Sequence, residues 1–142
     1  MQPDGATTHA QGGFARHLGT GAGSIGAARG AFTTWLQQTA ADPELLEDMA
    51  IVLSELASNA VEGADPERPG SEIRAEIADG VLEIVVSNRT PPRDAEVRRW
   101  DLDDTLRGGG RGLMIVRAYT DSLSVDSTGD TVSVRCTRRL PA

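Results

Sequence analysis

Apolar residues recur at helical spacing in two long stretches of the first half of the chain. The longer stretch runs from Pro43 to about Ala64, and its apolar stripe consists of Leu45, Leu46, Met49, Val52, Leu53, Leu56 and Ala60. The shorter runs from Ser24 to about Gln38 and repeats Ile25, Ala28, Phe32, Trp35 and Leu36. This period predicts two amphipathic helices, with Ser24 and Asp42 as their N-caps.

Shorter segments alternate between apolar and polar residues, which is typical of half-buried strands. We expect strands at 14–18, 73–77, 81–86, 123–125 and 132–136, the first of them at an edge. Asp79-Gly80 predicts a hairpin turn, and Leu113 begins a third helical pattern. Helices inserted between hairpins predict an α+β fold. We expect a two-layer α/β sandwich with one mixed sheet, three main helices on one face and a long lid loop.

The domain organisation follows from where this patterning begins. The first 13 residues are rich in Gly, Ala, Thr and Gln and show no period, which predicts a flexible N-terminal tail over 1–13. The rest of the chain is long enough for one domain with a hydrophobic core. We place that single domain at 14–140.

The pattern is interrupted once more, from Asn88 to Gly112, where Pro91-Pro92 and a lone Trp100 stand between charged residues. Loops of this length inside compact domains are usually functional. The interruption ends in a glycine-rich run directly before a helix: Gly108, Gly109, Gly110, Arg111 and Gly112. Glycines let the backbone approach a ligand, and free N–H groups at a helix start favour phosphate, with Arg107 and Arg111 adding charge.

Charge and cysteine content exclude several classes of function. The chain carries 21 acidic against 14 basic residues, and every basic residue is Arg. A net charge of −7 argues against direct nucleic-acid partners and against an anionic membrane surface. The one cysteine, Cys136, excludes an internal disulfide and is favoured as a small buried hydrophobe over a catalytic thiol. With no signal peptide and no membrane-spanning run, we expect a soluble, cytoplasmic protein.

Two polar residues on the longer helix carry candidate chemistry. Glu55 and Asn59 are four residues apart and therefore share a helix face beside the apolar stripe. The amide oxygen of Asn59 is a ligand that Mg²⁺ accepts beside phosphates and waters. Glu55 is placed to hold a metal-bound water or to accept a proton from an attacking hydroxyl. Together with the glycine run, these residues predict a nucleotide–Mg²⁺ pocket; the alternative is a half-solvated helix flank.

The run Glu55-Leu56-Ala57-Ser58-Asn59-Ala60-Val61 resembles the N-box of the ATPase superfamily that includes gyrase, heat-shock chaperones, histidine kinases and mismatch-repair proteins. Gly110-Arg111-Gly112-Leu113 resembles its glycine box. The length of the chain and the helix that carries Ala28-Arg29 before Trp35-Leu36 resemble one branch most, the anti-sigma-factor serine/threonine kinases and their actinobacterial relatives. This resemblance implies a Bergerat fold, with Glu55 as base and Asn59 binding Mg²⁺.

The resemblance also implies which residues surround ATP. The glycine-box amides, from Gly108 to Leu113, would hold phosphates, Arg107 is a candidate for the arginine of the lid, and Thr131 matches a threonine near the adenine. The middle box departs from the family, since Asn88 replaces an Asp that accepts a hydrogen bond from adenine, and Thr90 replaces a Gly. Because a carboxamide either donates or accepts, we expect Asn88 to relax selection for adenine.

The function that this resemblance implies is an ATP- and Mg²⁺-binding anti-sigma regulatory factor. It would transfer the γ-phosphate to a serine or threonine of an anti-anti-sigma (STAS-type) partner, sequester a sigma factor and act as a homodimer. The alternative is a degenerate member of the family, a non-catalytic protein-binding module with weak or no nucleotide binding. A histidine-kinase catalytic domain is less favoured, since neither a phosphoacceptor helix pair nor a sensor segment is present.

Overall fold

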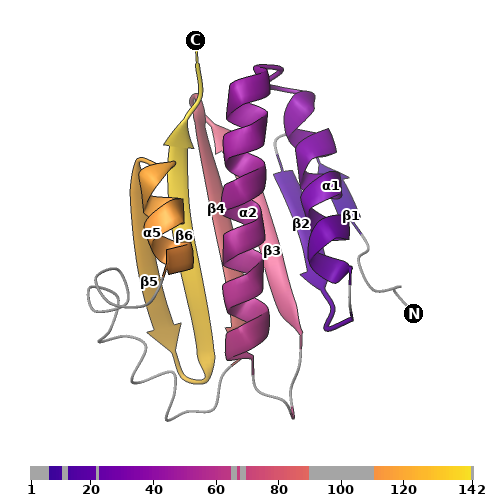
Figure 1. Ribbon diagram of the computed structural model, residues 1–142, viewed down its shortest axis with the longest axis vertical. Helices are drawn as coiled ribbons and strands as arrows, with labels where there is room; N and C mark the ends of the chain where they lie inside the picture. The colour runs from indigo at the N-terminus through magenta and orange to yellow at the C-terminus, as the bar shows by residue number, and fades with distance from the viewer. Residues whose placement is uncertain are drawn as a thin grey trace.

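The computed structural model describes residues 7–10, 13–21, 23–64, 67, 70–89 and 111–141. The side chains of residues 7–10 and of Arg111 lie outside this description. The elements along the chain are β1 (Thr7–Ala10), β2 (Gly13–Leu18), α1 (Ser24–Gln37), α2 (Pro43–Gly63), β3 (Ser71–Ala78), β4 (Val81–Arg89), α5 (Arg111–Ala118), β5 (Ser122–Thr128) and β6 (Thr131–Arg139). They form two layers, with the three helices on one face of the sheet (Figure 1).

The predicted α+β sandwich is confirmed, but the sheet is antiparallel rather than mixed. The described strands lie in the order β1-β2-β3-β4-β6-β5, and each neighbouring pair is antiparallel. Two helices connect β2 to β3, so the chain returns to the end of the sheet where β2 stopped. Strands β4 and β5 run in the same direction, but β6 lies between them. The connection from β4 to β5, which contains α5, is therefore a crossover that passes β6.

Strand β1 lies inside the stretch that the sequence predicted as a flexible tail. It pairs with β2 from Thr7 opposite Arg16 to Ala10 opposite Gly13, so β2 is internal and β1 occupies the edge. An edge strand is held by backbone N–H and C=O groups. Such pairing leaves no apolar period in the sequence, which is why the pattern did not indicate it.

The hydrophobic core fills the space between the helices and the sheet. Of the apolar stripe predicted on α2, every member except the half-buried Leu46 is fully or nearly fully buried. On β4 the buried positions alternate, and the series that faces the helices is Leu82, Ile84, Val86 and Asn88. The rings of Phe14, Phe32 and Trp35 join β2 to α1, with centroids 5.6 to 5.8 Å apart. Only Asn88 interrupts an otherwise apolar series on β4.

The two long helices begin in different ways. The Oδ2 atom of Asp42 accepts a hydrogen bond from the backbone N–H of Leu45 at 3.3 Å, which confirms the predicted N-cap of α2. Ser24, predicted as the N-cap of α1, is instead the first helical residue, and Gly23 occupies the cap with φ of 90°. Glycine adopts that backbone conformation without a steric penalty. None of the described helices is long and apolar enough to cross a membrane.

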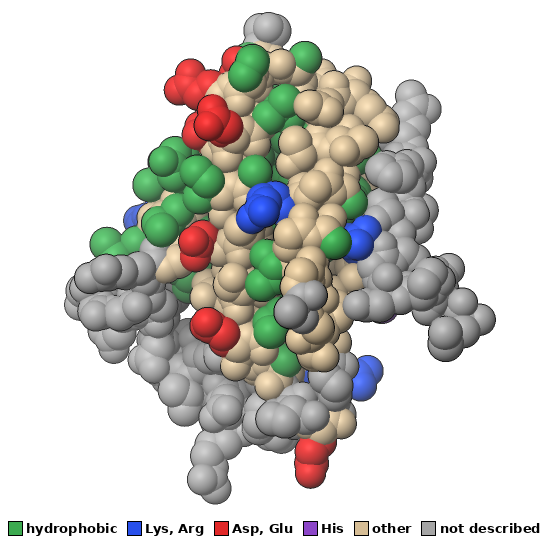
Figure 2. Space-filling model, turned by 45° about the vertical axis from the view of Figure 1, so that its right-hand side comes forward, with side chains coloured by type: hydrophobic (Ala, Val, Ile, Leu, Met, Phe, Trp, Pro, Cys, Tyr) green, Lys and Arg blue, Asp and Glu red, His purple; other side chains and the backbone are tan. Residues whose placement is uncertain are grey.

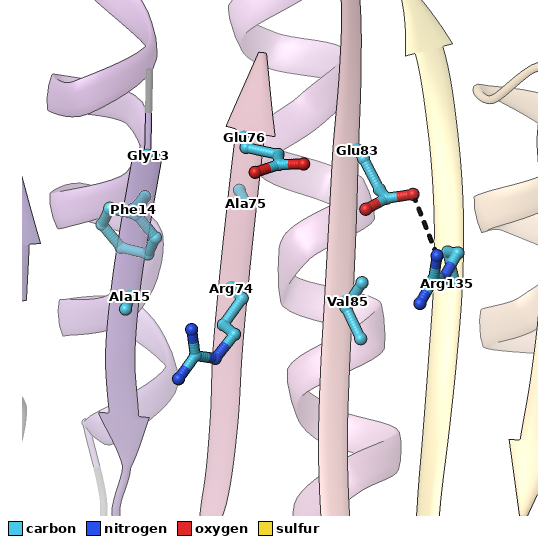
Figure 3. Close-up of a pocket in the computed structure, with 9 residues that line it drawn as sticks. All are labelled: Gly13, Phe14, Ala15, Arg74, Ala75, Glu76, Glu83, Val85 and Arg135. Atoms are coloured by element: carbon cyan, nitrogen blue, oxygen red, sulfur yellow. Dashed lines mark hydrogen bonds and ion pairs between the residues drawn. The ribbon is translucent and has the colours of Figure 1, made fainter. Parts of the chain in front are cut away.

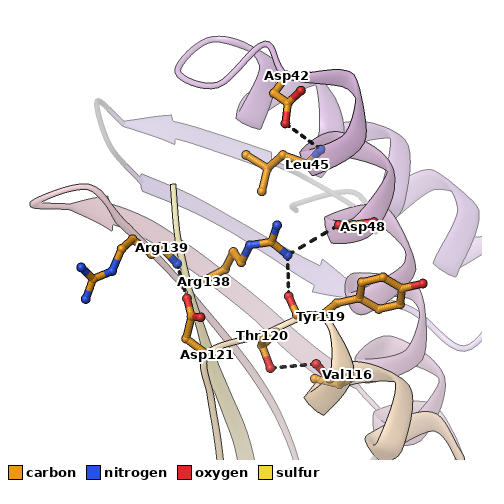
Figure 4. A network of polar contacts seen from close by, with 9 residues as sticks. All are labelled: Asp42, Leu45, Asp48, Val116, Tyr119, Thr120, Asp121, Arg138 and Arg139. Carbon is orange, nitrogen blue, oxygen red and sulfur yellow. Dashed lines mark hydrogen bonds and ion pairs between the residues drawn. The ribbon is translucent and has the colours of Figure 1, made fainter. Parts of the chain in front are cut away.

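One arginine joins three elements at the end of the sheet where α2 begins (Figure 4). Arg138 on β6 donates from Nη1 to the backbone carbonyl of Tyr119 at 2.7 Å and lies 3.6 Å from Oδ2 of Asp48 on α2. Next to it, Asp121 accepts a hydrogen bond from the backbone N–H of Arg139 at 2.6 Å. These contacts hold the C-terminal end of α5 against α2 and β6.

Candidate functional site

Gly112, in the first turn of α5, lies against the two polar residues of α2 that the sequence singled out. A Cβ atom added to Gly112 would lie 2.8 Å from Oε2 of Glu55 and 3.4 Å from Nδ2 of Asn59. A distance of 2.8 Å is shorter than carbon and oxygen tolerate without a shift. A side chain at position 112 would therefore displace the flexible end of the Glu55 side chain, and glycine leaves the carboxylate where it lies.

Glu55 and Asn59 lie on the flank of α2 beside its buried stripe. Both are half-buried, whereas Leu56 and Ala57 between them are fully buried. The shared helix face that their spacing predicted is confirmed. The backbone of α5 at Gly112 lies against this flank, so the flank does not face solvent alone.

The start of α5 supplies the second part of the candidate site. The described helix begins at Arg111. In the first turn of a helix, backbone N–H groups lack a partner within the helix and carry the positive end of its dipole. Leu113 is 9% exposed and packs into the core, so its side chain anchors this turn. Arg107, Gly108, Gly109 and Gly110 lie outside the described residues, as does the side chain of Arg111, and their proposed roles stay predictions.

Asn88 ends the helix-facing series on β4 and is 7% exposed. Its Nδ2 atom is buried and has no hydrogen-bond partner, and no other buried side-chain nitrogen or oxygen in the described part of the chain is in this condition. Folded proteins pair nearly all such groups, and leaving one unpaired costs about 1–3 kcal/mol. A buried donor without a partner is the kind of group that a bound ligand completes.

Thr131 does not share a face with Asn88. It pairs with Arg89 across β4 and β6, while Asn88 pairs with Val132. Because successive residues of a strand point to opposite faces, the register carries Thr131 to the face away from the helices and Val132 to the helix side. The Oγ1 atom of Thr131 donates to Oδ1 of Asp130 at 3.4 Å. Val132, 2% exposed, is the residue that the alternation in β6 would have indicated beside Asn88.

The donor set fits a magnesium ion that is held mainly by a nucleotide. Among the described residues, no group of three or more His, Cys, Asp or Glu side chains is placed to bind a metal ion by itself. Magnesium in nucleotide sites usually has one or two protein ligands and takes its other oxygens from phosphates and water. Asn59 and Glu55, next to the close approach at Gly112, match that requirement.

The opposite face of the sheet carries a hollow of about 440 Å³ that the sequence did not indicate. Figure 3 shows its charged side chains on neighbouring strands: Arg74 and Glu76 on β3, Glu83 on β4 and Arg135 on β6. A second hollow, of about 350 Å³, lies at the end of the sheet where β4 ends, and its lining includes Asn88 and Ser71 together with Glu72, Arg89 and Thr131. Neither contains Glu55, Asn59 or Gly112.

The outer surface of the helix layer, seen obliquely in Figure 2, carries hydrophobic, acidic and basic side chains. In this view several acidic side chains lie at the upper left, and basic side chains lie near the centre and on the right. The large hydrophobic residues most exposed in the described part of the chain are Ile51 on α2, at 40%, and Met114 on α5, at 48%.

Comparison with known proteins places the fold and the family. The chain resembles the SiaB–SiaC complex from Pseudomonas aeruginosa with a TM-score of 0.68 and 15% identity over 87% of this chain and 88% of that one. It resembles the RsbU and RsbW domains of Rv1364c from Mycobacterium tuberculosis with a TM-score of 0.65 and 20% identity over 90% of this chain. In that case it spans 33% of the length of the other chain.

At these identities the two structures show a shared fold. No curated protein matches the sequence. The model of the histidine kinase-like ATPase domain matches residues 21–136, which include Glu55, Asn59, Asn88 and Gly112. The chain therefore belongs to the family of histidine kinase-like ATPase domains.

Proposed function

We propose that this protein is an ATP- and Mg²⁺-binding regulator of the anti-sigma-factor kinase type, with residues 14–140 acting as one domain. It transfers the γ-phosphate of ATP to a serine or threonine of an anti-anti-sigma (STAS-type) partner, and it sequesters a sigma factor. It acts as a homodimer in the cytoplasm. The observation that carries the proposal is the approach of Gly112 to within 2.8 Å, measured from a built Cβ, of the Glu55 carboxylate beside Asn59.

Each residue of this cluster has a role that its chemistry supports. Asn59 offers its amide oxygen to the metal, and the backbone N–H groups at the start of α5 donate to phosphate oxygens. Glu55 accepts the proton of the attacking hydroxyl. Bound Mg²⁺ supplies charge neutralisation at the transferred phosphoryl group. Gly112 keeps the carboxylate of Glu55 within reach, because any larger residue would displace it.

A protein partner is supported by the structures that share the fold. One of them is a complex of SiaB with SiaC, and the other contains an RsbW domain in the same chain as an RsbU domain. Exposed hydrophobic side chains on α2 and α5, at Ile51 and Met114, add apolar surface to the helix layer near the cluster. Such surface is typical of protein contacts when it is rimmed by polar residues.

The second candidate function is a protein-binding module without catalysis. Asn88 favours it, because a neutral amide at a buried position is a weaker acceptor than the carboxylate that the family carries there. The two functions differ in one measurable property, Mg²⁺-dependent nucleotide binding. A protein-binding module that retains only the fold does not need to bind a nucleotide.

The decisive experiment is calorimetric titration with ATP and Mg²⁺ of the wild type and of two glycine variants. Gly112→Ala should weaken binding by about tenfold or more, since the added Cβ takes up space at the phosphate end of the proposed site, 3.4 Å from Nδ2 of Asn59. Gly30→Ala is the matched control, because nothing lies within 4 Å of a Cβ built on that residue of α1. This control should bind ATP like the wild type and be slightly more stable.

Labelled ATP then tests transfer to candidate anti-anti-sigma proteins. Transfer to a partner, lost in Gly112→Ala and kept in Gly30→Ala, supports the kinase. Binding of ATP without transfer to any partner contradicts the kinase and supports a nucleotide-binding module. If the wild type binds no ATP at millimolar concentration, the nucleotide site is vestigial and the non-catalytic module is the correct function.

A further inference from the structure

The edge of the sheet at β5 lacks the features that usually protect an edge strand. Among the described strands β5 pairs only with β6, so the backbone groups on its other side have no strand beside them. Its seven residues contain no Lys, Arg or Pro, and its pairing with β6 runs without a bulge from Ser122 to Thr128. The opposite edge strand, β1, has four residues. Because exposed edges pair readily with other chains, proteins commonly keep them short, charged or bulged.

The helix-side face of the sheet stays apolar as far as this edge. The register aligns Val125 on β5 with Val134 on β6, and Val134 with Val86 on β4, which is 2% exposed under the helices. Leu123, on the same face of β5, packs against the core, whereas the half-buried Val125 does not. The apolar row therefore ends at a valine that has no strand beyond it among the described residues.

Helix α5 carries apolar surface next to the same edge. Figure 1 shows α5 in front of β5 and β6, farther toward this edge than α2. Met114 is 48% exposed, although Val116, two residues further along the helix, is fully buried. Two residues correspond to about 200° around a helix, so Met114 lies on the side of α5 that faces away from the core. The edge strand and the helix above it thus both present apolar groups without a partner in the described structure.

We propose that β5 pairs antiparallel with β5 of a second copy of this chain, about a two-fold axis that passes through Val125 perpendicular to the sheet. The inference rests on the homodimer of the proposed function and names its interface. An axis at Val125, the middle residue of β5, pairs all seven residues and sets the two copies of Val125 opposite each other. The two sheets become one, both helix layers lie on the same side of it, and each Met114 lies beside the seam.

The polar face of the seam is complementary in the same register. Ser124 lies opposite Asp126 of the second copy, and within one chain Ser124 lies opposite Arg135. One row across the seam therefore contains Arg135, Ser124 and the carboxylate of the second copy, so a hydroxyl donor and a cation both approach it. The two-fold axis produces this row twice, and no like charges lie directly opposite each other. A second copy thus fits β5 on both of its faces.

The test measures dimerisation by sedimentation equilibrium, from about 1 to 200 µM protein. The wild type should dimerise with a dissociation constant on the order of 10 µM, since a seam between two strands is smaller than a standard interface. Ser124→Asp places like charges opposite each other twice and should raise that constant by about tenfold. Ser124→Lys places an ammonium opposite Asp126 and should lower it by a similar factor.

Matched controls separate this contact from the effect of net charge. Gly30→Asp and Gly30→Lys make the same charge changes on α1, where nothing lies within 4 Å of a built Cβ, and should change the dissociation constant by less than about twofold. Hydrogen exchange gives a second measurement. Amides of β5 should exchange more slowly as the protein concentration rises, while those of the β1 edge should not change.

The outcomes distinguish this inference from the proposed function. A dimer that responds equally to the substitutions at Ser124 and Gly30, with β5 exchange independent of concentration, overturns the interface and leaves the homodimer intact. Assemblies larger than a dimer also overturn it, because pairing of β5 with β5 uses both copies of that edge. A wild type that stays monomeric throughout overturns the inference and the homodimer together, while ATP binding and phosphoryl transfer are tested separately.

Discussion

The two faces of the sheet use polar side chains in opposite ways. On the open face, charged residues pair with one another, Arg74 with Glu72 at 2.7 Å and Arg135 with Glu83 at 3.3 Å. On the helix side the strand residues are almost all apolar, and Asn88 keeps an unpaired nitrogen. Density of charge therefore does not mark the candidate site. The site is marked by a few polar groups among apolar neighbours. A buried polar group without a hydrogen-bond partner costs free energy, and a ligand that supplies the partner recovers it.

The largest expected effect concerns Glu55. Glu55→Gln keeps the size of the side chain and its hydrogen bonding but removes the base, so transfer to the partner should fall by about 10²–10⁴-fold while ATP affinity changes little. Glu83→Gln makes the same change on the open face and should leave transfer unaffected. Initial rates with labelled ATP measure both variants. Equal loss of binding and transfer in Glu55→Gln would make Glu55 a structural or metal-shell residue.

The next comparison uses adjacent residues of β4 that point to opposite faces. Ile84 is 1% exposed under the helices, and Val85 is half-buried on the open face. Ile84→Ala should lower the free energy of unfolding by about 2–5 kcal/mol, because it leaves a cavity in the core. Val85→Ala should cost about 1 kcal/mol, a typical value for a partly exposed site. Urea denaturation measures both, and similar losses would mean that the open face is covered by further structure or by a partner.

A pH-dependent effect is expected from the one cysteine. Burial raises the pKa of the Cys136 thiol to about 12, whereas the thiol of an unfolded chain ionises near ~8.5. Only the unfolded chain then gives up the proton between these values, so stability is intact below ~8.5 and falls as the pH rises toward 12.

The slope should be on the order of 1 kcal/mol per pH unit, measured as the difference between the wild type and Cys136→Val. Other alkaline groups cancel in that difference. The same alkaline slope in both proteins would show that the thiol is ionised in the folded state and that this part of the helix-side face is open to water.

The smallest effect is expected for the ion pair on the open face. Arg135 and Glu83 are 51% and 31% exposed at their side chains, and exposed pairs are screened by water and salt. A double-mutant cycle with Arg135→Ala and Glu83→Ala should give a coupling free energy below about 1 kcal/mol. A larger coupling would contradict the view that charges on this face are only solvated, and would indicate a covered surface.

The sequence predicted the parts of this fold that depend on side-chain periodicity. The stripe of α2, the alternation of β4 and the N-cap at Asp42 follow from local chemistry and are confirmed. Strand β1 and the antiparallel arrangement depend on backbone pairing between distant segments. Local patterns contain no information about such pairing, so the sequence did not indicate strand β1, and the predicted mixed sheet was wrong.

The candidate site divides in the same way. The shared face of Glu55 and Asn59 follows from a spacing of four residues, which a helix makes predictable. That Gly112 touches this face depends on how α2 packs on α5. The separation of Thr131 from Asn88 depends on the register of β4 with β6, where a shift of one residue exchanges the faces. The unpaired nitrogen of Asn88 is a property of the assembled core and has no signal in the sequence.

The position of the sole thiol gives the protein a practical property. Cys136 is 1% exposed, and electrophilic reagents attack the thiolate, which is scarce at neutral pH for a thiol whose pKa is about 12. A cysteine introduced at an exposed residue of α2, such as Glu62, would therefore be labelled selectively in the native background. A fluorophore at that position would report on events at the helix flank of Glu55 and Asn59 without removal of the native cysteine.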